Sequence, residues 1–488
     1  MKIGARGKIG WLLRANRTLT DVHHKLRSGK EFARLFRADG ESALAPSHIT
    51  RWEQGGIAVS RATVRRYERL LDLRPESLVT VCDAVARTEV VREESADPRT
   101  GEERERDLKE LLDRALSGAV MTGLDWSSMA EIVRSTPGLF LFPTENWALL
   151  TGRLLEELVV SDHAEWLLRQ EAMSKLLEHP YAGVHAVQSC ISLVEDRASA
   201  AVLEPMSLLD VSASPSANAY ILGQLAKPDD QRVLYGAAVA ARQKLLRGHF
   251  DAAQVRGLLA AAAQRMKEGA AGDTLTSLRL LVQGVREPPP RTHVAEISTR
   301  VALQVHGAMA AEREDPLLVE MIDEALFGIE SDARMVAAMC LAATPYRAHV
   351  GTALLAEIQA GLVGRDEDFP RRALRTLTTL AVDVHRPLIL RILTTPGFNA
   401  GVREAAAWAL PHCAGRYAET TWRGLLAAYG GAWRRTPSDH LGRVLHGIAY
   451  GIGTDDYHGL TEEIRTDPSL PLVARRTAGW LGRTRRAG

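Results

Sequence analysis

The sequence has few aromatic residues, which make up 5% of its 488 positions. Sheets favour β-branched and aromatic side chains, whereas the many Ala and Leu residues of this chain favour helices packed on helices. The sequence also lacks any uninterrupted apolar run of the roughly 18 residues that a membrane-spanning helix requires. We therefore predict an all-α protein that does not associate with a membrane.

Cysteine is scarce as well, and its positions exclude two common kinds of site. The four cysteines lie far apart and form no CxxC pair; they are Cys82, Cys190, Cys340 and Cys413. This spacing fits neither a zinc site nor a disulfide framework, so we predict reduced thiols in the core of a cytoplasmic protein. The opening segment MKIGARGKIGWLLRANR is basic but has no apolar stretch of signal-peptide length, and we expect no export.

Charge is unevenly distributed along the chain. The formal net charge is +1, but the residues through Thr88 carry +8 and the remainder carries −7. A basic module attached to a mildly acidic body suggests that one end of the protein meets a polyanion such as nucleic acid. Small domains often carry a few excess charges, so the charge alone does not show that this region binds nucleic acid, and the residue pattern is needed as well.

The pattern along the chain separates three regions. Residues 1–87 contain short helical patterns broken by small polar turns. Residues 88–106 are charged, poor in apolar side chains and interrupted by Pro98 and Gly101, which is typical of a linker. Residues 107–488 contain longer helical stretches rich in Ala, Leu and Val, and the Pro288–Pro290 run marks a helix stop.

A weak repeat occurs within the third region. An Arg near the start of an Ala- and Leu-rich helix recurs at intervals of 37, 32, 40 and 32 residues, at Arg334, Arg371, Arg403, Arg443 and Arg475. Such intervals suit stacked helical hairpins in which small Ala residues allow close approach. The region resembles a degenerate HEAT-type α-solenoid, and Arg232 fits an earlier unit. An irregular helical bundle is the alternative, because Ala-rich helices produce similar coincidences.

The first region predicts five short amphipathic helices, each with one apolar face. Ser28 and Ser60 are suitable N-caps for the second and fourth helices. The expected core residues are Ile9, Leu12 and Leu13; Phe32, Leu35 and Phe36; Ile49 and Trp52; Val64, Tyr67, Leu70 and Leu71; and Leu78, Val79, Cys82 and Val85. Trp11 also falls on an apolar face.

Two motifs in this region, FARL (32–35) and SHITRWEQG (47–55), carry a family resemblance. They resemble the Cro/C1-type (XRE-family) helix-turn-helix domain, which has a lambda-repressor-like fold, over roughly residues 8–87. The resemblance implies that Ile49 and Trp52 are core residues, that Glu53 is structural and that Gly55 ends the third helix. The chain departs from the family in the long segment NRTLTDVHHKLRSG. A second helix beginning at Thr20 is a competing alignment, and we prefer a start at Ser28.

The resemblance also implies which side chains meet DNA, because the N-terminal end of the third helix reaches base edges in the major groove. The expected base contacts are Pro46, Ser47, His48, Thr50 and Arg51. The expected phosphate contacts are Ser28, Gly29, Lys30, Arg34, Arg61 and Arg65. The alternatives are that Arg51 pairs with Glu53 or a neighbour, and that His48 is only solvated. The run Arg61, Arg65, Arg66 and Arg69 is typical of a solvated helix face, and Arg61 is its best candidate for a contact.

Motifs of catalysis are absent, since the sequence contains no GxxxxGK[ST], HExxH or GxSxG. The segment AYGIGTDDYHG (449–459) suits a cation or phosphate loop, but a glycine-capped helix end followed by a new helix explains it more simply. Gly430 and Gly431 predict a similar turn. We predict that the protein is not an enzyme and uses no cofactor or metal.

The body of the protein is far larger than DNA binding requires. In layout it is similar to regulators that join such a DNA-binding domain to a helical-repeat receptor for peptides. We predict a cytoplasmic, sequence-specific transcription regulator that binds double-stranded DNA as a homodimer. Its helical repeats would bind a small-molecule, peptide or protein effector. The alternative is a protein-interaction scaffold of a plasmid, phage or defence system, with the N-terminal module as a docking domain.

Overall fold

The computed structural model describes residues 3–20, 24–36, 44–90, 101–197, 199, 201–284, 292–309, 315–360, 368–395 and 397–484. All regular elements within these ranges are helices, so the all-α prediction is confirmed for the described part of the chain. None of the described helices combines the length and the hydropathy that crossing a membrane would take. The Pro288–Pro290 run lies outside the described residues.

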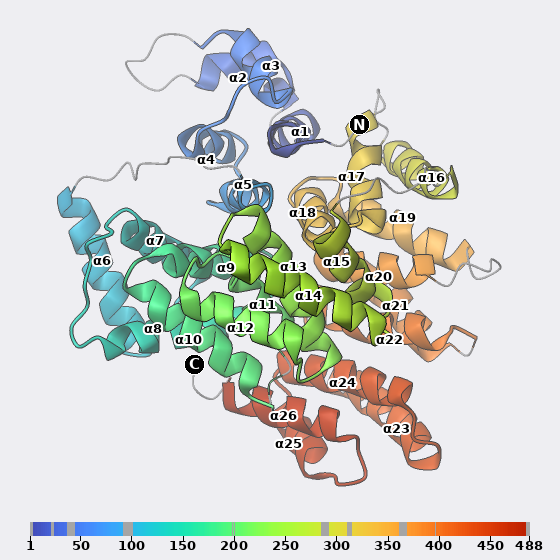
Figure 1. Cartoon of the computed structure of the whole chain (residues 1–488). Coiled ribbons are helices and arrows are strands. Elements are labelled where there is room, and N and C mark those ends of the chain that lie inside the picture. Colours follow the sequence, from blue (N-terminus) through green and yellow to red (C-terminus); the bar gives the residue numbers. More distant parts are fainter. Residues whose placement is uncertain are drawn as a thin grey trace. The chain divides into compact units, whose positions relative to one another are not determined.

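The chain forms two compact units. The first combines residues 1–93 with residues 290–482, and the second contains residues 94–289. The predicted repeat region is therefore divided between the two units. Figure 1 colours the chain from the N-terminal module in blue to the last helices in red.

The N-terminal module of the first unit consists of five α-helices and one 3₁₀ turn. They are α1 (Ala5–Leu19), η1 (His24–Arg27), α2 (Gly29–Phe36), α3 (Pro46–Glu53), α4 (Arg61–Leu70) and α5 (Ser77–Thr88). The five predicted helices are confirmed, and the second begins directly after Ser28, as preferred. Ser60 caps α4 by accepting a hydrogen bond from the Thr63 N–H at 3.2 Å, as predicted.

The C-terminal part of the first unit is a succession of helices that pack on their sequence neighbours and on the next helix but one. They are α16 (Thr292–Ala308), α17 (Pro316–Phe327), α18 (Ser331–Ala342), α19 (Arg347–Ala360), α20 (Asp368–Leu380), η3 (Asp383–His385), α21 (Arg386–Thr394), α22 (Ala400–Ala409), η4 (Leu410–His412), α23 (Glu419–Arg435), α24 (Asp439–Thr454), α25 (His458–Thr466) and α26 (Leu472–Thr484). The five arginines of the sequence repeat fall near the starts of α18, α20, α22, α24 and α26. The first four of these helices form one continuous row of contacts.

In two glycine-rich segments of this part the glycines lie inside helices and not at the helix ends that the sequence predicted. Gly430 and Gly431 lie inside α23, and Gly451 and Gly453 lie inside α24. A methyl group on Gly451 would overlap Trp422 and one on Gly453 would overlap Leu481, so these glycines allow close packing. The turn expected at Gly430 and Gly431 was wrong. The helix end expected within residues 449–459 is present, since α24 ends at Thr454 and α25 begins at His458, but the glycines lie inside α24 and do not cap it.

The second unit repeats the same arrangement in a shorter form. Its helices are α6 (Gly101–Leu116), α7 (Gly123–Arg134), α8 (Glu145–Val159), α9 (His163–Glu178), α10 (Ala182–Glu195), α11 (Leu203–Leu208), α12 (Pro215–Ala226), α13 (Gln231–Leu246), α14 (Ala252–Lys267) and α15 (Gly272–Gln283). Helices α7, α9, α11, α13 and α15 form one row of successive contacts, and α8, α10, α12 and α14 form a second. Helix α6 begins inside the predicted linker, at Gly101.

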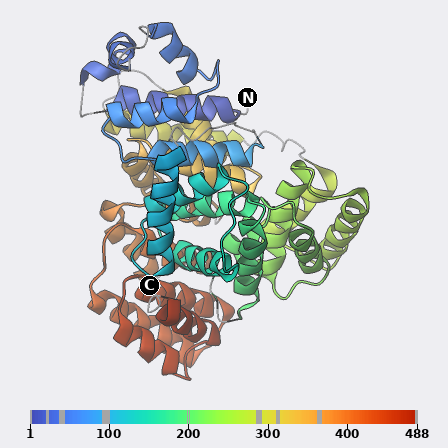
Figure 2. The same cartoon turned by 90° about the vertical axis from the view of Figure 1, so that its left-hand side faces the viewer.

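The N-terminal module packs against helices that lie some 300 residues later in the chain. Helices α1 and α5 contact α18, and Figures 1 and 2 draw them beside the first helices of the C-terminal part. Trp11 is fully buried, stacks on Tyr346 with ring centroids 6.1 Å apart, and donates its Nε1–H to Asp315 Oδ2 at 2.8 Å. Arg14 Nη2 donates to the other oxygen of Asp315, also at 2.8 Å.

A buried lysine strengthens the same contact. Lys8 is 1% exposed, and its Nζ lies 2.8 Å from Glu324 of α17 and 3.1 Å from Glu89, beside the end of α5. Burial alone would lower the pKa of Lys8, but the two carboxylates raise it above its usual value, so the ammonium stays charged. The side-chain amide of Asn16 adds a hydrogen bond to the Ala343 carbonyl at 2.8 Å. The module is thus attached by charged and polar bonds as well as by aromatic packing.

We predict that Asp315→Asn loosens this attachment. The substitution keeps an acceptor for the Leu317 N–H that Asp315 caps, but it removes the charge that Arg14 faces. A hydrogen bond to a charged group contributes about 1.5–3 kcal/mol, so amide hydrogen exchange in α1 should become faster by roughly tenfold or more. Asp230→Asn is the matched control, because Asp230 also caps a helix but its Arg partner is local and exposed. Unchanged exchange in α1 of Asp315→Asn would contradict the prediction.

Candidate nucleic-acid interface

Helix α3 begins and ends where the sequence motif predicts. Pro46 occupies its first turn, where the missing N–H costs nothing. The chain leaves the helix through Gly55, which has a φ of +70° that favours glycine. A side chain on Gly10 of α1 would collide with the carbonyls of Trp52 and Glu53, so α1 and the end of α3 meet backbone to backbone.

One side of α3 is anchored by a buried charge network. Ile49 is 1% exposed and Glu53 is 5% exposed. The Glu53 carboxylate accepts hydrogen bonds from Arg17 Nε at 2.6 Å and Arg17 Nη2 at 2.7 Å, and from the Tyr67 hydroxyl at 3.1 Å. The network therefore joins α3 to α1 and α4, and the structural role that the resemblance implied for Glu53 is confirmed.

The ion pair keeps the Arg17 guanidinium protonated in spite of its burial. Burial would lower the pKa of Arg17, but the hydrogen bonds and the charge of Glu53 raise it above its usual value. Burial and the nearby carboxylate raise the pKa of Tyr67, so its hydroxyl keeps its proton and donates it. Arg17 Nη1 also donates to the carbonyl of Arg27, beside the start of α2. The position of α2 relative to α3 is therefore tied to the same guanidinium.

Aromatic packing completes the contact between α2 and α3. Phe36 lies 5.4 Å from Trp52 and 5.6 Å from Tyr67, centroid to centroid. Phe32 is fully buried, and Trp52 is half-buried. The expectation that Leu35 is a core residue was wrong, since Leu35 is 41% exposed. Phe32 and Phe36 already fill the short face that α2 turns to its neighbours, which leaves Leu35 outside.

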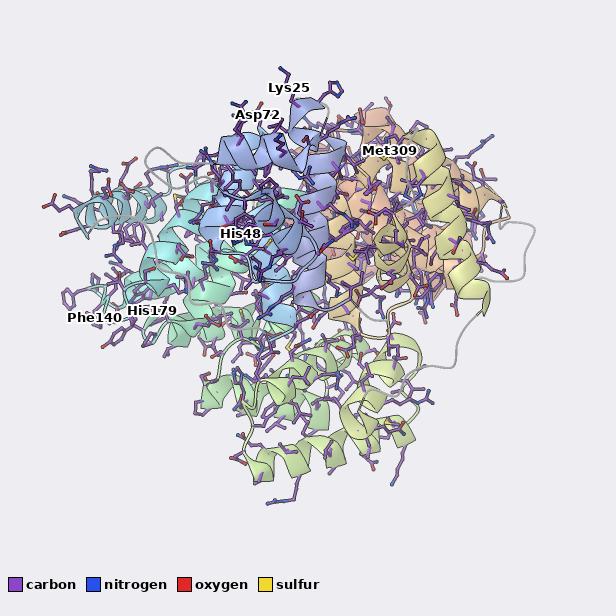
Figure 3. The ribbon with its side chains drawn as sticks, turned by 90° about the horizontal axis from the view of Figure 1, so that it is seen from above. Lys25, His48, Asp72, Phe140, His179 and Met309 are labelled. Atoms are coloured by element: carbon purple, nitrogen blue, oxygen red, sulfur yellow. The ribbon has the colours of Figure 1, made fainter. Side chains whose placement is uncertain are left out.

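The opposite side of α3 is open to solvent. All five residues expected to contact bases are exposed: Pro46, Ser47, His48, Thr50 and Arg51. The structure gives the Arg51 side chain no ion pair with any described residue, and the alternative of a pair with Glu53 is excluded because Glu53 binds Arg17. His48 lies with its ring centroid 6.3 Å from that of Trp52, and Figure 3 shows it on the N-terminal module seen from above.

The start of α2 provides the second part of the surface. Ser28 and Lys30 are exposed and Gly29 is half-buried. The first turn of a helix presents N–H groups that lack acceptors within the helix, and such a turn suits a phosphate oxygen. Arg34 is exposed but pairs with Glu31 at 3.0 Å on the same helix.

The arginines of α4 are largely engaged within the protein. Arg61 binds both oxygens of Asp83, at 2.9 and 2.8 Å, and its side chain is 13% exposed. Arg65 binds both oxygens of Glu76, at 2.5 and 3.2 Å, and Arg66 donates to the Leu35 carbonyl. The run was expected to be a solvated face with Arg61 as its best candidate for a contact, but acceptors on neighbouring elements hold Arg61, Arg65 and Arg66. Arg69 is exposed, as expected.

Other candidate sites of the sequence have structural explanations. The Asp455 carboxylate accepts hydrogen bonds from the Tyr417 N–H at 3.0 Å and from Trp422 Nε1 at 2.7 Å, which ties the turn after α24 to α23. All four cysteines are free and buried, as predicted, and burial raises the pKa of Cys413 to about 11. Within the described ranges no cluster of three or more His, Cys, Asp or Glu side chains is arranged to hold a metal ion.

Sequence reasoning missed the partner of Glu53. Arg17 was not singled out, although a basic residue on the first helix and an acidic residue at the end of the third were both visible. Their separation of 36 residues gives no periodic signal. The contacts of Trp11 and Arg14 with Asp315 were missed for the same reason, at separations of 304 and 301 residues.

We predict that Glu53→Gln strongly destabilises the N-terminal module. Breaking a buried ion pair by removing one partner costs about 3–5 kcal/mol, because the other charge is left unpaired. Urea unfolding followed by hydrogen exchange in α1, α3 and α4 measures the loss. Glu31→Gln is the matched control, since its partner Arg34 is exposed and such surface pairs contribute at most about 1 kcal/mol. Equal losses of unfolding free energy in the two variants would show that the buried pair contributes no more to stability than the exposed pair.

Comparison of the chain with models of known protein families, with curated proteins and with solved structures gave no match.

Proposed function

We propose that the protein is a sequence-specific DNA-binding transcription regulator whose N-terminal module is a helix-turn-helix domain of the Cro/C1 type. One observation carries the proposal: α3 is fixed on one side by Ile49 and by the buried Glu53–Arg17 pair, and its opposite side is exposed, with an Arg51 guanidinium that pairs with none of the described residues. A rigid helix with a polar tip and an exposed arginine suits insertion into a major groove.

Each exposed residue of α3 has a role in this proposal. Arg51 reads guanine through O6 and N7, because an exposed guanidinium can make that bidentate contact. Ser47 and His48 donate to bases or phosphates from the first turn, and Thr50 lies one turn further along. Pro46 has no N–H donor and offers an apolar contact to a thymine methyl group.

The phosphate contacts are assigned to the start of α2. Gly29 and the exposed Ser28 and Lys30 bind one phosphate through backbone N–H groups and one ammonium. Arg34 is a second contact once its exposed pair with Glu31 opens, which costs little. Arg61 and Arg65 contribute less, because each would have to leave a two-bond ion pair with a carboxylate of its own chain.

The helices beyond the module are assigned to sensing and assembly. Their rows of next-but-one contacts and the recurring arginines support degenerate HEAT-like hairpins in both units. Such repeats present long surfaces for a small-molecule, peptide or protein effector. We further propose that the regulator is cytoplasmic and binds an inverted repeat as a homodimer, since two modules double the contacts across half-sites.

The attachment of α1 supports a route from effector to DNA. Trp11 and Arg14 hold Asp315 at the start of α17, and Lys8 holds Glu324 near its end. A shift of α17 would therefore move α1, and α1 is joined to α3 by the Arg17–Glu53 pair. Effector binding on the C-terminal helices would act by favouring one orientation of the reading helix.

We predict that Arg51→Ala and Lys30→Ala affect DNA binding differently. Loss of a base-reading arginine should remove about 1–3 kcal/mol of discrimination at one base pair in each half-site. Loss of a phosphate contact should weaken binding to specific and random DNA alike and reduce the slope of log affinity against log salt by about one. Selection of bound fragments by the full chain, followed by titrations at several salt concentrations, measures both effects.

Arg69→Ala serves as the control for a change of charge, since Arg69 is exposed at the end of α4, outside the α2–α3 surface. Equal losses on specific and random DNA for Arg51→Ala would contradict the base-reading role. No DNA affinity at low salt, together with recovery of a protein partner, would contradict the regulator and favour the scaffold.

A further inference from the structure

The loop between α7 and α8 exposes an unusual amount of apolar surface. It contains the run Leu139-Phe140-Leu141-Phe142-Pro143, and Phe142 is 87% exposed while Phe140 is 52% exposed. Large aromatic side chains are normally buried when they have no function at the surface. Nothing in the proposed DNA-binding role uses this loop, which lies in the second unit.

The loop is held in place by a buried histidine. His179 Nε2 lies 3.2 Å from the Thr136 carbonyl, and its Nδ1 accepts hydrogen bonds from the Tyr181 and Ala182 N–H groups at 3.3 and 3.2 Å. This pattern requires the neutral ring with its proton on Nε2, and burial lowers the pKa of His179 accordingly. Phe140 packs edge-on against Tyr181 at 5.4 Å. Figure 3 shows Phe140 at the edge of the molecule, with His179 behind it.

Neighbouring helices extend the exposed surface. Leu149 of α8 is 62% exposed, and Tyr181 and Val184 at the start of α10 are 44% and 64% exposed. Helices α8 and α10 pack directly on each other, which places these side chains on adjoining elements. We call Phe140, Phe142, Leu149, Tyr181 and Val184 the apolar face.

Four of its five residues lie in segments without charge, whereas Leu149 lies on α8 with Glu145 and Arg153 four residues to either side. Residues 135–144 and residues 179–194 contain no Asp, Glu, Lys or Arg. An uncharged surface offers nothing to attract an acidic or basic partner selectively. These segments are equally free of like charges that would repel a second copy, so the same face can meet itself across a two-fold axis.

We propose that the apolar face is the surface through which two copies of the chain pair. With a fully exposed aromatic side chain taken as roughly 200 Å², the five side chains expose on the order of 500 Å² in each copy. Pairing two such faces buries about 1,000 Å² from these side chains, which is about the area that a specific interface between proteins requires.

This inference deepens the proposed function, because an operator with two half-sites needs two modules, but its test needs no DNA. The experiment is sedimentation equilibrium of the full chain over a wide range of concentration. The wild type should be a dimer, and Phe142→Glu should dissociate at least ten times more readily, because pairing would bury an unpaired carboxylate in each copy. Phe142 has little packing to lose, and Val184→Glu on α10 is a second, independent variant with the same expected result.

Leu246→Glu is the matched control, since Leu246 lies in the same unit, is 50% exposed and is not part of the apolar face. It should leave the dimer intact, and unchanged far-UV circular dichroism should accompany all three substitutions. A monomeric wild type, or a Phe142→Glu protein that dimerises like the wild type, would overturn the proposal. A dimer that fails to bind DNA would contradict only the proposed DNA binding, whereas a DNA-binding monomer would contradict the pairing surface and the homodimer but not the reading of DNA by α3.

Discussion

The buried pair between Arg17 and Glu53 is the interaction on which the N-terminal module depends. It joins the end of α1 to the end of α3, includes the hydroxyl of Tyr67 on α4, and reaches the segment before α2 through Arg17 Nη1. Removing two charges from water is costly, and the cost is offset only when the geometry is good and the remaining hydrogen bonds are satisfied. Here groups from α1, η1, α3 and α4 together supply these hydrogen bonds. The orientation of the exposed side of α3 follows from this network.

The sequence predicted much of this module, because its information there is local. The spacing of apolar residues located all five helices, and the motif around Trp52 located the exposed and buried sides of α3. The repeated arginines were also informative, since Arg334 and Arg403 fall at similar places in α18 and α22. These features depend on neighbours within one or two helical turns, and such neighbours are visible in the sequence.

The sequence did not predict contacts between residues far apart in the chain. Arg61 and Arg65 looked available for phosphate contacts because their acceptors, Asp83 and Glu76, lie outside α4 and could not be foreseen. Gly451 looked like a helix end because Trp422, which occupies the space beside it, belongs to a different helix. Leu35 looked buried because its neighbours are apolar, but Phe32 and Phe36 fill the contact. In each case the missing information is the identity of the partner across the interface.

The two ends of the chain build one unit, and this has a consequence for the order of synthesis. Helices α1 and α5 are covered by α17 and α18, which follow only after residues 94–289. At a translation rate of about 5–20 residues per second, that interval lasts roughly 10–40 s. During this time the ribosome carries a nascent module whose Trp11 side chain and Lys8 ammonium have not yet met Asp315 and Glu324. The nascent polypeptide therefore passes through a stage in which α1 has been synthesised but α17 and α18, which cover it, have not.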